Sequence, residues 1–132
     1  MSWLDDVQTY LNTALAGYAS GTNLFKNTLP DSPAVAMCIY DAGGNPVPHG
    51  ANVPWSEHVL EVRNRAASDS AAASAAEAVR ALLDFKDTVT MGSSAVRWIR
   101  ADSPPYFIER DPKNRVTYMT RYVLQRTRDN SY

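Results

Sequence analysis

The chain of 132 residues contains one cysteine, Cys38, and only two histidines, His49 and His58. A single cysteine excludes an internal disulfide and a metal cage built from several thiolates. The histidines lack the H-x-x-x-H and H-E-x-x-H spacings of helical zinc sites, so we expect no metal and no cofactor. The longest uninterrupted apolar run covers residues 34–40, far short of the roughly 20 residues that span a membrane.

The chain also lacks an excess of charge of either sign, because 13 basic side chains face 14 acidic ones. This balance gives no general footprint for nucleic acid or an anionic membrane. The distribution is uneven, since residues 1–60 hold five acids and one base, whereas the remainder holds twelve bases and nine acids. Two such regions can solvate two faces of one domain, or they can pair between subunits of a head-to-tail ring.

Motifs of catalysis are absent as well. The Gly43-Gly44 pair is not followed by the lysine of a phosphate-binding loop, so it indicates a turn. Asp5 and Asp6 stand at the start of a predicted helix, where they compensate the helix dipole. Their position also argues against the basic start of a secretory leader, so we expect a protein made in a reducing cytoplasm. We predict that the protein is not an enzyme; the weakest alternative is a small enzyme that uses His49 or His58.

The hydrophobic pattern predicts an α+β fold, a mainly antiparallel sheet with two helices packed on one face. We expect a single domain over residues 1–127 and a polar C-terminal tail over 128–132. The predicted helices cover 2–17 and 68–85, with Ser2 as one cap and Ser68 or Asp69 as the other. The predicted strands cover residues 24–29, 34–40, 57–66, 88–91, 95–101, 106–110 and 115–126.

Two features fit contact surfaces. The first is a long loop over residues 41–54, rich in glycine and proline, which serves either as a functional loop or as a mere connection. Its candidate interface residues are Gly43, Gly44, Asn45, His49, Asn52 and Trp55. The second is a set of arginines on predicted strands, which belong either to a solvated face or to an interface that meets DNA or acidic partners. These candidates are Arg63, Arg65, Arg97, Arg100 and Arg121.

The order and spacing of several segments resemble the minor capsid or tail terminator proteins of long-tailed bacteriophages. The resemblance covers most of the chain and rests on no single motif of catalytic specificity. Its segments are Trp3-Leu4-Asp5, Gly21 to Lys26, Leu29 to Pro33, Leu60 to Ala66, Ala81 to Asp84, Pro105 to Asp111 and Tyr118 to Leu124.

The resemblance implies a structural protein of the virion, assembled in the host cytoplasm and located at the head–tail junction. Members form a hexameric ring that caps the tail tube, stops its polymerisation and gives the neck a docking surface. The implied partners are further copies of the chain, the tail tube protein and the neck or connector proteins, with DNA passing through the lumen as an open question. Two alternatives remain: another neck ring (head closure, or tail completion and head–tail joining), and a small non-enzymatic adaptor.

Overall fold

The computed structural model describes residues 3–44, 55–92 and 94–127 and contains nine regular elements in those ranges. The helices are α1 (Trp3–Ala14) and α2 (Asp69–Leu83). The strands are β1 (Leu24–Lys26), β2 (Ala36–Asp41), β3 (Trp55–Ala66), β4 (Lys86–Met91), β5 (Ser94–Ala101), β6 (Tyr106–Arg110) and β7 (Val116–Thr127).

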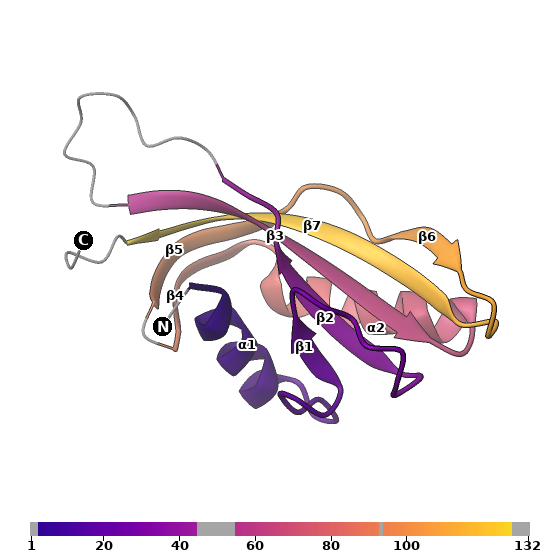
Figure 1. Cartoon of the computed structure of the whole chain (residues 1–132). Helices are drawn as coiled ribbons and strands as arrows, with labels where there is room; N and C mark the ends of the chain where they lie inside the picture. The colour runs from indigo at the N-terminus through magenta and orange to yellow at the C-terminus, as the bar shows by residue number, and fades with distance from the viewer. Residues whose placement is uncertain (1–2, 45–54, 93, 128–132) are drawn as a thin grey trace.

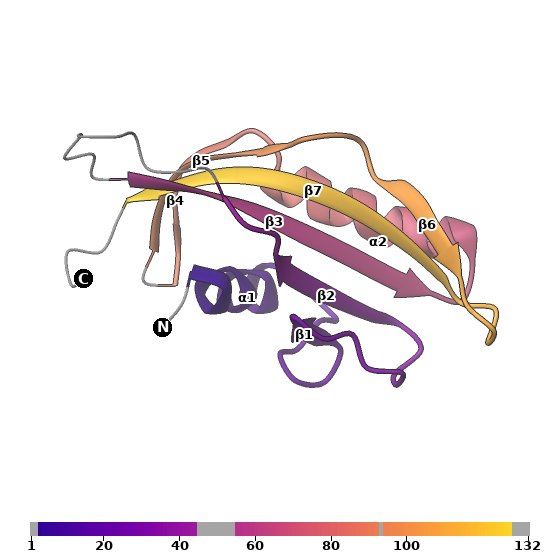
Figure 2. The same cartoon turned by 45° about the horizontal axis from the view of Figure 1, so that its top comes forward.

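All strands join one seven-stranded sheet of order β1-β2-β3-β7-β5-β4, and β6 pairs with β7 outside this path. Only β1 and β2 run parallel; every other pair is antiparallel. The 12-residue strands β3 and β7 pair along their whole length and form the centre of the sheet (Figure 1). The sheet therefore has β1 and β2 at one margin and β4 at the other (Figure 2).

Both helices pack on the same face of this sheet, as the sequence predicts (Figure 1). Leu4, Val7 and Leu11 of α1 and Val79 and Leu83 of α2 lie in one buried cluster. The sheet contributes alternate residues to that cluster, because successive side chains on a strand point to opposite faces. These sheet residues include Met37, Ile39, Leu60, Val62, Ile99, Tyr122 and Leu124. The fold is α+β, and Cys38 is buried in β2.

Most element boundaries agree with the sequence prediction, and the largest differences have local backbone causes. The first helix ends at Ala14 rather than at residue 17, and the turn after it contains Gly17 with a φ of 90°. Strand β1 ends at Lys26 rather than at residue 29, because Asn27 adopts a left-handed φ of 61°. Helix α2 ends at Leu83 rather than at residue 85, because its C-cap Asp84 has an extended backbone with a ψ of 138°; Phe85 follows with a φ of 58°.

The start of α2 follows the predicted capping. Ser68 has extended backbone angles, and its hydroxyl accepts a hydrogen bond from the Ala71 N–H at 3.2 Å. This bond satisfies one of the N–H groups that a helix leaves unpaired at its first turn. The Ser2 cap predicted for the first helix and the predicted polar tail lie outside the described residues.

Candidate functional site: the open face of the sheet

The face of the sheet opposite the helices carries most of the predicted interface arginines. No helix of the described ranges covers this face, which is called the open face below. This face carries charged, polar and aromatic side chains, together with two valines that pair across β3 and β7. Its residues include Tyr40, Val59, Glu61, Arg63, Trp98, Arg100, Arg121 and Val123.

Arginines and aromatic rings stack together at the β4–β5 side of the open face. The guanidinium carbon of Arg97 lies 4.4 Å from the centroid of the Trp55 ring. That of Arg100 lies 5.3 Å from the Trp98 ring and 5.7 Å from the Phe85 ring. A register shift between Val96 and Trp98 is a bulge, which turns Arg97 and Trp98 toward the same face. The structure thus brings together three of the predicted residues from two strands.

Phe85 is the most exposed large hydrophobic residue of the described chain, with 73% of its surface accessible. Its left-handed φ of 58° is rare for a bulky residue and costs energy, and Thr88 nearby has a φ of 52°. Arg100 lies over the Phe85 ring and forms an ion pair with Asp87 at 3.6 Å. Phe85 is not among the residues predicted from the sequence, because it falls at the end of the second predicted helix, 68–85.

The arginines at the centre of the open face differ in their contacts. Arg63 donates from Nε to Glu61 at 2.8 Å and lies 5.0 Å from the centroid of the Tyr40 ring. Burial raises the pKa of the Tyr40 hydroxyl above its ordinary value, so this ring stays neutral beside the guanidinium. Arg121 is exposed on β7, and Glu61 is its neighbour across the β3–β7 pair.

Arg65 has a structural position instead. Only 6% of this residue is exposed, and its guanidinium donates to three backbone carbonyls of the segment that links β1 to β2. The two terminal bonds reach Pro30 and Pro33 at 2.6 Å, and the Nε bond reaches Ala34 at 3.2 Å. The side chain therefore fastens this segment to β3, and its burial leaves little guanidinium surface for a partner.

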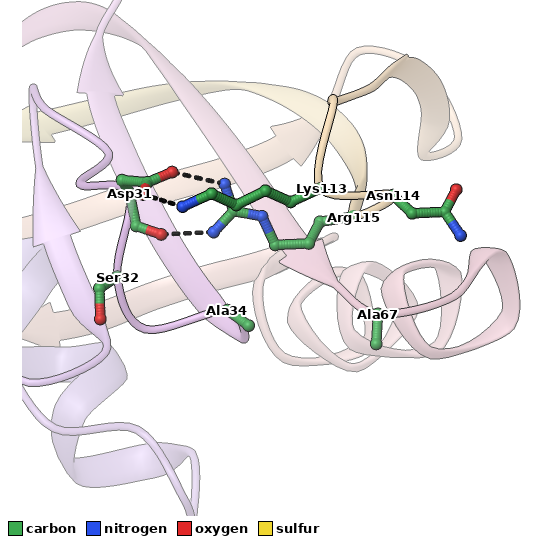
Figure 3. Close-up of a pocket in the computed structure, with 7 residues that line it drawn as sticks. All are labelled: Asp31, Ser32, Ala34, Ala67, Lys113, Asn114 and Arg115. Carbon is green, nitrogen blue, oxygen red and sulfur yellow. Dashed lines mark hydrogen bonds and ion pairs between the residues drawn. The ribbon is translucent and has the colours of Figure 1, made fainter.

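A second charged cluster lies at one end of the sheet. It lines an open pocket of about 500 Å³ (Figure 3). Asp31 points toward Lys113 and Arg115 and forms ion pairs with both, at 2.7 Å for Arg115. Arg115 also binds Asp111 at 2.7 Å. Hydrogen bonds from Lys113 and then Arg115 lower the pKa of Asp31 to about 2. The pocket is lined by Asp31, Ser32, Ala34, Ala67, Lys113, Asn114 and Arg115.

This cluster accounts for part of the uneven charge distribution along the sequence, because it pairs an acid of the first part of the chain with bases of the last part. Asp31, from the acidic first part of the chain, pairs within the subunit with two bases of the last part. Asp5 similarly pairs with Lys26. These acids are therefore already neutralised inside the chain, whereas Asp41 lies exposed at the end of β2.

The predicted interface loop is described only at its two ends. Gly43 and Gly44 continue from β2, and Trp55 begins β3; Asn45, His49 and Asn52 lie outside the described residues. Val59 fixes the first end, since it accepts from the Ala42 N–H at 2.9 Å and donates to the Gly43 carbonyl at 2.7 Å. A side chain at Gly44 would collide with the Glu57 carbonyl at 2.3 Å, so this glycine allows a close backbone approach.

His58 contributes to the packing of α1 rather than to the open face. Its ring stacks on Trp3 with 4.6 Å between centroids, and its Nε2 accepts from Arg126 Nε at 3.3 Å. Burial and then the charge of Arg126 lower the pKa of His58. Burial also raises the pKa of the Cys38 thiol, which lies in the core.

Within the described ranges, no three His, Cys, Asp or Glu side chains gather as metal ligands. No described helix is long and apolar enough to cross a membrane.

The fold and the open face define a small α+β protein with one helix-covered sheet face and one face of arginine and aromatic contacts. The family model of bacteriophage tail terminator proteins matches residues 10–128. The chain therefore belongs to the bacteriophage tail terminator family, which makes it a structural component of a phage tail. The resemblance found in the sequence is thereby confirmed.

A search of curated proteins finds no match. A solved structure of another protein aligns over 100% of this chain and 99% of its own, with a TM-score of 0.58 and 13% sequence identity. That likeness concerns the fold alone.

Proposed function

We propose that this protein forms a ring, with six copies as the expected number, that caps the finished tail tube. The ring stops further addition of tube subunits and presents its other side to the neck of the virion. Membership of the tail terminator family over residues 10–128 carries this proposal. The geometry supports it through a subunit with two distinct sheet margins and two distinct strand ends, which suits a head-to-tail ring.

The open face is our candidate for the wall of the central channel. The helices cover the other face, so a ring with its helices outside turns the open face inward. Arg63, Arg97, Arg100 and Arg121 then contribute four arginines per subunit to this wall or to its subunit contacts. Whether these guanidinium groups touch DNA is tested by the salt dependence of DNA binding, because each phosphate contact steepens that dependence.

The two ends of the strands are our candidates for the contacts with the tube and the neck. One end carries the connection between β2 and β3, with Gly43, Gly44 and Trp55 at its described limits. The other carries the ion-paired cluster of Asp31, Lys113 and Arg115. A ring stacked between two assemblies needs two different surfaces, and the described residues of the two ends differ: glycines and a tryptophan at one, ion-paired charges at the other.

A tube-growth assay tests the proposed function. Tail tube protein from the same phage is allowed to polymerise with and without the purified terminator, and tube lengths are measured by negative-stain microscopy. We expect added terminator to arrest elongation and to leave a cap on one tube end. Tubes that grow at an unchanged rate without caps would contradict tube capping and would favour another neck ring; binding of a single copy to a partner would favour an adaptor.

A further inference from the structure

A closed ring built by head-to-tail contact requires two different, complementary surfaces on each subunit. This inference rests on the ring proposed above and concerns which surfaces meet. The sheet order places β4 at one margin and the β2 side at the other, so these margins are natural sides for neighbouring subunits.

One margin carries a projecting aromatic ring with cations beside it. Phe85 precedes β4, is 73% exposed and is held in a left-handed conformation that most residues avoid. Arg100 lies over its ring and pairs with the exposed Asp87 of β4 at 3.6 Å, whereas Lys86, which follows Phe85, is exposed and supplies the cation of this margin. An exposed aromatic beside an arginine has the composition of an interface hot spot. Strain that the rest of the subunit maintains at such a position indicates a function for the side chain.

The opposite margin carries a surface of small residues with one acidic side chain. Residues 41–44 are all exposed and consist of one aspartate, one alanine and two glycines. A Cβ built on Gly43 meets no atom of the described residues within 4 Å. Hydrogen bonds to Val59 fix this segment to the sheet. Residues 36–44 include no base, so Asp41 sets the sign of this surface.

The two surfaces lie at the same level along the strands. Ala42 bonds to Val59, Val59 pairs with Val123, and Val123 pairs with Arg100, which covers the Phe85 ring. Rotation about the ring axis relates neighbours without a shift along that axis. If the strands run roughly along the ring axis, two surfaces at the same level along the strands therefore come into contact in neighbouring subunits.

We propose that Phe85 of one subunit packs on the segment 42–44 of the next copy of this chain, with Lys86 facing Asp41. The occupant of each surface is thus a second copy, chosen by charge complementarity and by the match of a projecting ring to a segment of small residues. Backbone pairing between the sheets is not part of this contact, because the Asn27 side chain accepts from the Asp41 N–H and the Asp41 carboxylate accepts from the Gly43 N–H.

A disulfide-trapping experiment tests the contact on assembled protein, with tail tubes present as template. The double variant Asp41→Cys/Lys86→Cys is oxidised and run on a denaturing gel; the native Cys38 is fully buried. We expect a ladder of covalent oligomers up to the closed ring. Each single variant should give no ladder, because the two cysteines of a contact come from different surfaces. The matched control Glu77→Cys/Lys86→Cys, with one cysteine moved to the exposed side of α2, should also give none.

A second variant keeps the test decisive if the double variant folds poorly. Phe85→Gly removes an exposed side chain and suits the left-handed backbone, so its thermal midpoint should be equal to or above that of the parent. We expect it to lose ring formation, whereas Phe107→Ser, which removes an exposed aromatic on β6, should retain it. Normal ring formation by Phe85→Gly would overturn this contact. Rings of the double cysteine variant that give no covalent ladder would also overturn it. Either result would leave the proposed function unaffected. Absence of rings and caps from the parent protein would overturn both.

Discussion

Arg65 provides the sharpest test of how the structure divides the arginines into structural and surface groups. We expect Arg65→Met to destabilise the fold strongly, because its guanidinium donates three hydrogen bonds to carbonyls of the segment between β1 and β2. A hydrogen bond from a charged donor contributes about 1.5–3 kcal/mol, but three bonds from one group are not independent. The released carbonyls lie near the surface and regain water, so we expect a net loss of about 2–4 kcal/mol.

Thermal unfolding followed by circular dichroism measures this loss. A change of 1 kcal/mol shifts the midpoint of a domain of this size by roughly 4 °C, so we expect a decrease of about 8–16 °C. Arg63→Met is the matched control, two residues away on the same strand. Its ion pair with Glu61 is partly buried, with 35% and 15% of the two side chains exposed, and we expect it to contribute about 1 kcal/mol. An Arg65→Met midpoint within about 4 °C of the parent, which is the size of the expected Arg63→Met effect, would refute the assignment.

Three further predictions concern single side chains. The pKa of Asp31 is about 2 in the folded state, so its stabilising effect is complete above pH ~4 and is lost toward pH 2; Asp31→Asn should lack this part of the acid sensitivity in urea titrations. The pKa of His58 is lowered by burial and by Arg126, so the unfolded chain takes up the proton first and stability declines as pH falls below about 6.5. His58→Phe, which keeps the stack on Trp3, should flatten thermal midpoints between pH 7 and 5 (about the range over which free histidine titrates); equal slopes would contradict this. Ser68→Ala should cost about 1 kcal/mol by loss of the α2 cap, and an unchanged midpoint would argue against that cap.

Much of the fold follows from periodicity in the sequence. Both helices, the buried strand β2 and the long strands β3 and β7 have clear apolar patterns, and the structure confirms them. Two of the errors lie beside residues with a left-handed backbone. Asn27 shortens β1, and asparagine adopts this conformation more readily than most residues. Helix α2 ends before the extended Asp84, and Phe85 then takes a left-handed conformation that a bulky residue rarely adopts, so its type gave no sign of it.

The candidate site could be predicted only in part. Alternation along β3 suggested one charged face with Arg63 and Arg65 together, yet the structure buries Arg65 against a segment about 30 residues away. Such long-range hydrogen bonds depend on topology, which the pattern does not encode. The contact between Arg97 and Trp55 joins strands that are distant in sequence, so it could not be predicted from the sequence pattern either. What the sequence offered was the residue types, arginine beside tryptophan, on strands of the sheet.

Electron microscopy of the purified protein at high concentration, alone and mixed with purified tail tubes, tests the central claim most directly. We expect rings with a central hole and six-fold symmetry, or the same rings seated on tube ends. Protein that remains monomeric in solution and also leaves every tube end bare would contradict it.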